Sequence, residues 1–195
     1  MIMIKQVCVY CASSTKISQE YLLAASEIGK ILANNKISVV YGGGSVGSMG
    51  ALADAVIEND GKLIGVIPKF MMELEWGNPM VSEMKIVETM SERKQLFLEN
   101  VNAVIALPGG TGTLEELSEV ISLKKLGLFT KPIIIVNTKG FYNNLLLFIE
   151  QMVVDNFIRS DHKDLFTVIT SPDEMINSIL NAPKWEGKAL NLAAI

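Results

Sequence analysis

The sequence is best approached from Ser91-Glu-Arg-Lys-Gln-Leu-Phe-Leu-Glu-Asn-Val-Asn-Ala-Val-Ile-Ala-Leu-Pro-Gly-Gly-Thr-Gly-Thr-Leu-Glu-Glu116, which predicts a helix, a short strand, a glycine turn and a second helix. Residues 102–107 are an apolar run between an Asn and a Pro-Gly-Gly sequence, which is typical of a parallel strand covered on both faces. Because this strand joins two helices, the stretch predicts an α/β fold. It places Arg93 at the start of one helix and Glu116 at the start of the next.

The glycine turn of this stretch suits a ligand that approaches the main chain. Gly109, Gly110 and Gly112 allow backbone conformations closed to other residues, and they carry no side chains that would keep a ligand away. Thr113 is expected to cap the helix that follows. The free N–H groups of that helix's first turn, together with its dipole, favour an anion, so the turn predicts a phosphate site.

Glu116 has two interpretations, one structural and one functional. Thr113-Leu-Glu-Glu116 fits a capping box, in which Thr and Glu bind each other's backbone N–H groups at a helix start. Helical phase gives the other interpretation: counted from Leu114 at about 100° per residue, Glu116 falls on the side that the apolar residues occupy. Glu115 and Glu119 fall on the polar side. A carboxylate on the buried side needs a partner.

Arg93 is the candidate partner for that carboxylate. A cation in the first turn of a helix opposes the helix dipole, whereas the neighbouring Glu92 is favourable there. Arg93 is therefore unusual at this position. The alternative is an ordinary solvated surface arginine, and these residues alone leave both interpretations open.

Composition limits the class of protein. With 195 residues the chain suits one domain, residues 1–195, with a full hydrophobic core. Apolar residues make up 49% of the chain, yet no run reaches the roughly 18 apolar residues of a membrane span. The N-terminal residues show no secretory signal, so we expect a cytoplasmic protein that does not bind membranes. The net charge of −4 and the scattered lysines argue against a nucleic-acid partner.

Cys8 and Cys11 have the Cys-x-x-Cys spacing of redox and zinc sites. They lie in a predicted strand, where residues three apart point to opposite faces with Cα atoms about 10 Å apart, too far for a disulfide. Zinc would need two further ligands. The single histidine, His162, lies in a distant polar segment and is expected to be solvated. We therefore expect two buried, unreactive thiols, no metal site and no cofactor.

Strands alternate with helices along the chain. The predicted strands cover residues 5–11, 37–41, 62–67, 84–87, 102–107, 132–136 and 166–169. This alternation predicts a Rossmann-like, doubly wound parallel sheet of about seven strands with helices on both faces. Residues 70–79 are expected to be irregular. In such folds ligands bind at the carboxyl ends of the strands, where Ser13, Arg93 and both glycine turns would gather.

The other glycine turn follows the second predicted strand. Gly42, Gly44 and Gly47 match G-x-G-x-x-G, the pattern of a dinucleotide-binding turn. That pattern also requires an acidic residue about 20 positions on, at the end of the next strand, and here that strand ends in Pro68. We therefore expect no NAD. The turn, which includes Gly43, is interpreted either as a loop that can accommodate a phosphate or as a loop that packs closely against the rest of the protein.

Two motifs at matching spacing indicate a family. Pro108-Gly-Gly-Thr-Gly-Thr-Leu-Glu-Glu116 resembles the Pro-Gly-Gly-x-Gly-Thr-x-x-Glu motif of the Lonely Guy family of cytokinin riboside 5′-monophosphate phosphoribohydrolases, often labelled possible lysine decarboxylases. Met90-Ser-Glu-Arg-Lys94 is similar to the family's Met-His-x-Arg-Lys motif. Val-Tyr-Gly-Gly-Gly44, Met49-Gly50 and Gly65-Val-Ile-Pro68 also match, within a resemblance that runs from Val7 to about Ile158. It implies a homodimeric hydrolase that releases a free base and ribose 5-phosphate from a purine nucleoside monophosphate.

The resemblance also implies roles for single residues. Arg93 and Glu116 would be catalytic. The 5′-phosphate would be held by Gly110, Thr111, Gly112 and Thr113, and further contacts to the nucleotide would come from Glu75, Lys94 and Ser122. Position at the ligand-binding edge adds five residues to the predicted substrate-binding set, namely Ser13, Gly43, Gly44, Gly109 and Glu115.

Some positions depart from the plant members of the family. Thr111 stands where they have Tyr, Ser91 replaces His, Ala12 replaces Gly, and residues 121–125 replace a Thr-Trp-x-Gln stretch. These positions line or adjoin the base pocket. The preferred base, cytokinin-type or adenine, is therefore left open.

The implied chemistry suits the residues present. Cleavage of an N-ribosidic bond develops positive charge on the ribose, which a fixed carboxylate such as Glu116 stabilises while it orients or deprotonates a water. Arg93 would hold the phosphate or polarise the departing base. Nothing marks a lysine for the Schiff base of a pyridoxal-phosphate decarboxylase. The alternative function is a non-catalytic nucleotide sensor, which would keep the glycines without needing Glu116.

Overall fold

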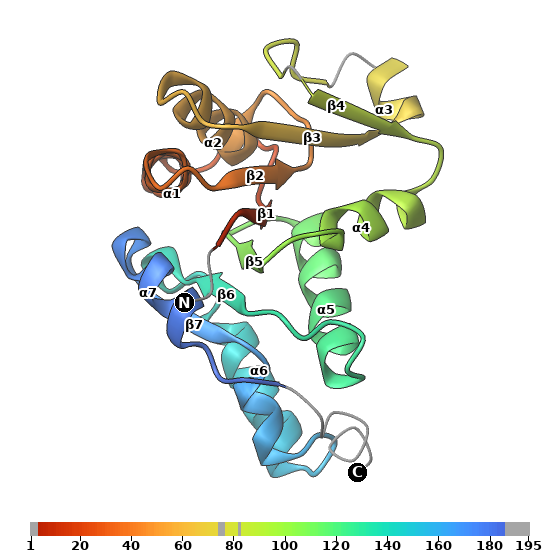
Figure 1. The fold of residues 1–195 in the computed structure, drawn as a ribbon. Coiled ribbons are helices and arrows are strands. Elements are labelled where there is room, and N and C mark those ends of the chain that lie inside the picture. Colours follow the sequence, from red (N-terminus) through yellow and green to blue (C-terminus); the bar gives the residue numbers. More distant parts are fainter. Residues whose placement is uncertain (1–3, 74–76, 82, 186–195) are drawn as a thin grey trace.

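The computed structural model describes residues 4–73, 77–81 and 83–185 (Figure 1). Within these ranges, seven strands form one sheet in the order β4-β3-β2-β1-β5-β6-β7, and every neighbouring pair is parallel. The strands are β1 (Gln6–Tyr10), β2 (Ser38–Tyr41), β3 (Leu63–Pro68), β4 (Glu83–Val87), β5 (Ala103–Ala106), β6 (Ile133–Val136) and β7 (Thr167–Ile169). Each lies within or beside its predicted range, and the predicted fold class is confirmed.

Helices cover both faces of this sheet (Figure 1). One face carries α1 (Gln19–Asn34), α2 (Gly47–Glu58) and α7 (Met175–Asn181), and the other carries α4 (Met90–Leu98), α5 (Thr111–Lys125) and α6 (Asn143–Val154). A short helix, α3 (Lys69–Glu73), follows β3, and the 3₁₀ turns are η1 (Thr138–Gly140), η2 (Ser160–Leu165) and η3 (Pro172–Glu174). Among the residues that the structure describes, no helix is long and apolar enough to cross a membrane.

Two buried clusters hold these layers together, one on each face of the sheet. Successive residues of β1 alternate between them, as the pleat of a strand requires. Val7 and Val9 pack with Leu52 of α2, whereas Cys8 packs with Phe97 of α4. Because both faces are covered, the central strands have no polar side, which explains their continuous apolar sequences.

The two cysteines are free and buried, as predicted. Cys8 belongs to the cluster beneath α4 and α5, and Cys11 belongs to the cluster on the opposite face. Burial raises the pKa of both thiols, so both are protonated at neutral pH.

The strand order reverses between β1 and β5. The strands β2, β3 and β4 extend the sheet on one side of β1, and β5, β6 and β7 extend it on the other. The chain leaves β1 for a helix on one face and leaves β5 for a helix on the other. The loops that follow β1 and β5 therefore diverge, which opens a crevice at the carboxyl edge of the sheet.

The start of α5 differs from the prediction. Gly110 is the N-cap, in an extended conformation with φ −83° and ψ −159°, and Thr111 is the first helical residue. Leu114 donates its N–H to the Gly110 carbonyl at 3.0 Å. Because the helix begins three residues earlier than a Thr113 cap would place it, Thr113 does not cap it, and the capping-box interpretation of Glu116 is wrong.

Two further predictions about local structure are wrong. The segment expected to be irregular after β3 begins with α3, whose Met71 and Met72 are half-buried and keep it against the sheet. His162, expected to be solvated, is buried in η2. Its ring lies edge-on to Trp185 at 6.3 Å between centroids, a contact between distant parts of the chain that local polarity does not reveal.

Candidate active site

A cavity of about 600 Å³ lies where the loops diverge. Three loops form most of its lining: the loop after β1, including Ser13; the glycine turn after β2, including Gly42 and Gly44; and the turn after β5, from Gly110 to Thr113. Arg93 and Glu116 also line it. The structure therefore gathers, at one sheet edge, the segments that the sequence predicted to meet there.

The turn after β5 presents an open helix N-terminus to the cavity. A Cβ atom added to Gly110 or Gly112 would meet no other atom within 4 Å, so both glycines face open space. The first helical hydrogen bond is donated by Leu114, so the N–H groups of residues 111–113 precede it. Those N–H groups and the helix dipole make this part of the cavity suitable for a phosphate.

Arg93 reaches the cavity from α4 and is held in one orientation. Its side chain is buried, with Nε donating to the Val66 carbonyl and Nη2 to the Gly42 carbonyl, each at 3.0 Å. The guanidinium carbon lies 5.0 Å from the centroid of the Phe97 ring, a cation–π contact. Burial lowers the pKa of Arg93 from its usual value, but an arginine remains charged. The alternative of a solvated surface arginine is excluded.

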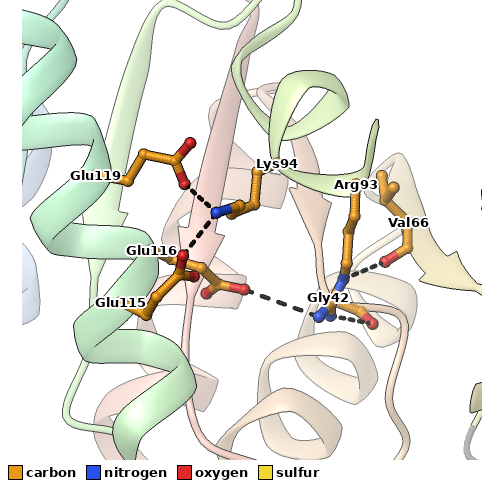
Figure 2. A network of polar contacts seen from close by, with 7 residues as sticks. All are labelled: Gly42, Val66, Arg93, Lys94, Glu115, Glu116 and Glu119. Carbon is orange, nitrogen blue, oxygen red and sulfur yellow. Dashed lines mark hydrogen bonds and ion pairs between the residues drawn. The ribbon is translucent and has the colours of Figure 1, made fainter. Parts of the chain in front are cut away.

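Glu116 faces Arg93 across the cavity (Figure 2). Its Oε1 lies 3.8 Å from Nη1 of Arg93, an ion pair longer than a hydrogen bond, and its side chain is only 11% exposed. Burial raises the pKa of Glu116 to about 7, with the Arg93 charge opposing the shift. The helical-phase interpretation of Glu116 is confirmed, because the carboxylate lies on the buried side of α5 beside the predicted partner.

Lys94 and Glu115 lie beside this pair but outside the cavity lining. The Lys94 Nζ is 2.6 Å from Oε1 of Glu115 and 2.7 Å from Oε2 of Glu119 (Figure 2). Ser122, one turn further along α5, is exposed and donates its hydroxyl to the Ser118 carbonyl. Within one chain, these predicted nucleotide contacts therefore do not join Arg93 and Glu116 around the cavity.

The remaining predicted residues fall into three groups. Ser13, Gly44 and residues 110–113 line the cavity, whereas Gly43 and Gly109 are not part of its lining. Gly43 has φ +80°, and Gly109 lies directly against the Thr113 side chain. Glu75 lies outside the described residues.

The turn after β2 is tightly packed. A Cβ atom on Gly42 would lie 2.6 Å from Nη2 of Arg93 and 2.8 Å from Sδ of Met49. Gly47 has φ +63°, and its Cβ would lie 2.6 Å from the Ser14 carbonyl oxygen. Of the two interpretations of this turn, these glycines therefore favour close packing.

Sequence reasoning missed the apolar part of the cavity. Val46, Met49, Ile67 and Met71 line it, as does Cys11. Cys11 and Ile67 adjoin the carboxyl ends of β1 and β3 at the ligand-binding edge, which is a usable signal. Across the described ranges, no group of three or more His, Cys, Asp or Glu side chains is arranged to hold a metal ion.

Comparisons with known proteins identify the family. The family model described as possible lysine decarboxylase matches residues 49–179. A probable cytokinin riboside 5′-monophosphate phosphoribohydrolase of Oryza sativa subsp. japonica, LOGL9, is 44% identical over 169 residues, which are 87% of this chain and 74% of that protein. The cytokinin riboside 5′-monophosphate phosphoribohydrolase LOG1 of Arabidopsis thaliana is 41% identical over 175 residues, covering 90% of this chain and 82% of that protein.

A solved structure shares the fold. The molybdenum cofactor carrier protein of Chlamydomonas reinhardtii superposes with a TM-score of 0.69 at 19% identity, over 92% of this chain and 98% of that chain. At this identity the likeness shows the fold alone. The family model and the plant relatives together show that the chain belongs to the Lonely Guy family of cytokinin riboside 5′-monophosphate phosphoribohydrolases, an enzyme family also described as possible lysine decarboxylases.

Proposed function

We propose that the protein hydrolyses the N-glycosidic bond of a purine nucleoside 5′-monophosphate, giving a free base and ribose 5-phosphate. The observation that carries this proposal is the buried Arg93–Glu116 pair, which faces the same cavity as the open N-terminus of α5. The activity printed in the names of the plant relatives supports it.

The 5′-phosphate binds at the N-terminus of α5. Residues 110–113 offer backbone N–H groups and, at Gly110 and Gly112, room for an anion to approach the main chain. With the phosphate fixed there, the ribose extends toward Glu116, five residues beyond the helix start. The glycine turn thus sets the distance between the phosphate and the carboxylate.

Glu116 acts on the ribose carbon that holds the base. As the C1′–N bond breaks, its carboxylate stabilises the positive charge and accepts a proton from the attacking water. The water oxygen bonds to C1′, the electrons of the C1′–N bond stay on the base, and the proton that Glu116 took from the water is passed to the departing base. Since the pKa of Glu116 is about 7, this carboxyl can take up and return a proton near neutral pH.

The charge of Arg93 favours the ionised form of this carboxylate, and its side chain offers donors to the substrate. Val66 and Gly42 accept hydrogen bonds from Nε and Nη2, which leaves the Nη1 donors directed toward Glu116 and the cavity. A phosphate oxygen and a nitrogen of the departing base are both chemically suitable acceptors for them. Arg93 is thus assigned to the catalytic pair with Glu116.

The base is placed against the apolar wall of the cavity. Met49, Ile67 and Met71 form that wall, and thioether and aliphatic groups suit the flat face of a purine. Of the positions that depart from the plant members, Ala12 and Thr111 line the cavity. These two residues are the ones expected to affect the choice between a cytokinin-type base and adenine.

A base-release assay tests this function. The purified protein is incubated with AMP, with isopentenyladenosine monophosphate and with a panel of other nucleoside monophosphates, and free base is measured by chromatography. Glu116→Gln serves as the matched inactive control. We expect base release from at least one purine monophosphate and none from the free nucleosides. Absence of base release from every monophosphate, with nucleotide binding retained, would favour the sensor alternative.

Lysine decarboxylation is not supported by the cavity. A pyridoxal-phosphate decarboxylase needs a lysine amine to form a Schiff base, and no lysine is among the described residues that line the cavity. Lys94, the neighbour of Arg93 in the sequence, is bound to two carboxylates. Incubation with lysine and pyridoxal phosphate is expected to give no carbon dioxide and no aldimine absorbance band.

The protein is also proposed to act as a homodimer. No residue of α6 is fully buried, and Leu147 and Phe148 are 66% and 58% exposed. Leu145 and Leu146, on another side of the same helix, already pack on the core. A second copy would cover the exposed side of α6, so light scattering is expected to give twice the 21.3 kDa chain mass. A monomer mass at micromolar concentration would contradict this.

A further inference from the structure

Two consecutive residues of α4 each form ion-pair contacts with α5, one in the interior and one at the surface (Figure 2). Arg93 of α4 faces Glu116 of α5 in the interior, and Lys94 faces Glu115 and Glu119 at the surface. The inner contact belongs to the proposed catalytic pair. The outer contact has no role in the mechanism described so far.

The ammonium group of Lys94 contacts two carboxylates of α5, those of Glu115 and Glu119. Both of its contacts, at 2.6 and 2.7 Å, are short charge-assisted hydrogen bonds. Its side chain is 23% exposed, and the residue does not line the cavity. The hydrogen bonds to Glu115 and Glu119 raise the pKa of Lys94, so it remains charged. Its ammonium group thus lies on the outer side of the two helices, away from the proposed nucleotide site.

We propose that Lys94 is a positioning residue, which holds α4 against α5 and offsets the charges of Glu115 and Glu119, so that Glu116 can ionise beside Arg93. This inference rests on the proposed function for its effect on turnover. Its effect on the carboxyl group itself does not depend on any activity.

The packing of α4 gives the outer contact its importance. Only Arg93 and Phe97 are fully buried in this helix, so a single apolar side chain provides most of its deep anchoring. An isolated surface ion pair contributes little to stability. Here one ammonium group bridges two carboxylates on the partner helix, directly beside a contact of 3.8 Å that a small helix shift would lengthen.

The charge distribution on α5 gives the second reason. Glu115, Glu116 and Glu119 lie within about one helical turn, and without Lys94 two uncompensated negative charges would favour the protonated form of Glu116. The charges of Glu115 and Glu119 raise the pKa of Glu116, whereas Lys94 lowers it.

Other titratable groups facing Glu116 do not replace Lys94. On β1 and directly after it these are Cys8, Tyr10 and Cys11, and burial raises the pKa of each, so they are uncharged near neutral pH. On α4 the remaining charge is Arg93, which carbonyl groups already hold in place. Lys94 is therefore the charge that balances the surface carboxylates of α5.

A direct nucleotide contact by Lys94 is the competing explanation, and a set of variants separates the two. Lys94→Met removes the charge, Lys94→Arg keeps it, and Lys94→Met combined with Glu115→Gln removes one charge of each sign. Lys62→Met, which breaks the surface pair with Glu83 at 2.9 Å elsewhere in the sheet, is the matched control. Two readouts are used: the Glu116 carboxyl pKa in ligand-free protein by ¹³C NMR, and kcat and KM across pH.

In Lys94→Met the pKa of Glu116 is expected to rise by about half a unit. The acid limb of the pH profile of kcat/KM should shift to higher pH by the same amount. Lys94→Arg and the double variant should return both toward the wild-type values, and Lys62→Met should change neither. At pH 9, where Glu116 is ionised in all variants, KM should be unchanged. An unaltered Glu116 pKa in Lys94→Met, or a KM raised equally in Lys94→Met and the double variant, would overturn the proposal. The NMR titration needs no turnover, so it remains decisive if the proposed hydrolysis is not found.

Discussion

The glycine turns after β2 and β5 look alike in sequence but differ in what surrounds them. Around Gly42 and Gly47 the protein itself fills the space where side chains would be, with Arg93 and the Ser14 carbonyl in contact. Around Gly110 that space is empty within 4 Å. A glycine motif therefore indicates that something approaches the main chain, and only the fold tells whether that is the protein or a ligand.

The two turns contribute to one site in different ways. The turn after β2 holds a side chain, because the Gly42 carbonyl accepts a hydrogen bond from Arg93. The turn after β5 starts the helix that carries Glu116 and leaves its N-terminus open. One turn orients the cation of the proposed catalytic pair, and the other positions the carboxylate and forms the proposed phosphate site.

The largest expected effect concerns Glu116, the carboxylate placed by the open turn. Glu116→Gln preserves size and should lower kcat by about 10²-fold or more, because a neutral amide cannot stabilise the developing charge. Nucleotide affinity should be nearly unchanged. Steady-state kinetics and nucleotide titration measure both, with Glu58→Gln, an exposed position at the end of α2, as the control.

Arg93→Ala tests whether the pair acts as a unit. Combined with Glu116→Gln, it should be little slower than either single variant, since groups that act together are non-additive. If the double variant lost kcat by the product of the two single-variant factors, Arg93 and Glu116 would act separately. Full turnover in Glu116→Gln would remove the carboxylate from the mechanism altogether.

The next largest effect is on stability and depends on pH. The pKa of Glu116 is about 7 in the fold, above the roughly 4.3 of an unfolded glutamate. A pKa that is higher in the folded state favours the neutral form, so stability is lost as pH rises from about 4 to above 7. Above pH 7 the ionised carboxylate lowers the free energy of unfolding by up to about 4 kcal/mol.

Glu116→Gln removes this penalty. The variant should match the wild type in urea unfolding at pH 4.5 and exceed it at pH 8, while Glu58→Gln shows no such difference. If the free energies of unfolding of variant and wild type differed by a constant amount between pH 4.5 and 8, Glu116 would have the same pKa in the folded and unfolded states.

Most of the fold could be predicted because its signals are local. Continuous apolar runs indicated the central strands, and helical phase indicated that Glu116 lies on the buried side of α5, where the structure places it beside Arg93. The start of α5 could not be predicted, because a glycine such as Gly110 is compatible with both helix and cap conformations. His162 was misplaced because its contact, Trp185, is distant in sequence.

The site was predicted less completely than the fold. The family resemblance predicts that Lys94 and Ser122 contact the nucleotide, which stays a prediction. In the structure Lys94 pairs with Glu115 of α5, and Ser122 donates to the Ser118 carbonyl within that helix. The positions of Glu115 and Glu119 four residues apart on one helix face were a signal for the Lys94 contact that motif matching does not use. Which loop side chains reach the cavity depends on how the loops diverge, and sequence alone does not fix that.

A smaller effect is expected when alanine replaces a glycine in each turn and the free energy of unfolding is compared. Gly47→Ala forces a side chain into φ +63° and places its Cβ 2.6 Å from the Ser14 carbonyl oxygen, which should lower the free energy of unfolding by about 2 kcal/mol. Gly110→Ala meets no atom within 4 Å and should leave it nearly unchanged. Urea unfolding of the two variants measures both values. Equal losses of unfolding free energy in the two variants would show that the two turns are equally packed.

The smallest expected effect is on substrate binding by the open turn. Gly110 has φ −83° and ψ −159°, which alanine adopts without strain, so Gly110→Ala should fold normally. Its methyl group would occupy cavity space beside the N–H groups of residues 111–113. The KM for a nucleoside monophosphate should rise about tenfold, which is 1.4 kcal/mol, with kcat little changed, because phosphate contacts are made in both the ground and transition states. Inhibition by inorganic phosphate should weaken by a similar factor, whereas binding of a nucleoside without phosphate should not change. If Gly110→Ala weakened nucleoside and nucleotide equally, the open turn would hold the base or ribose, and the phosphate would lie elsewhere in the cavity.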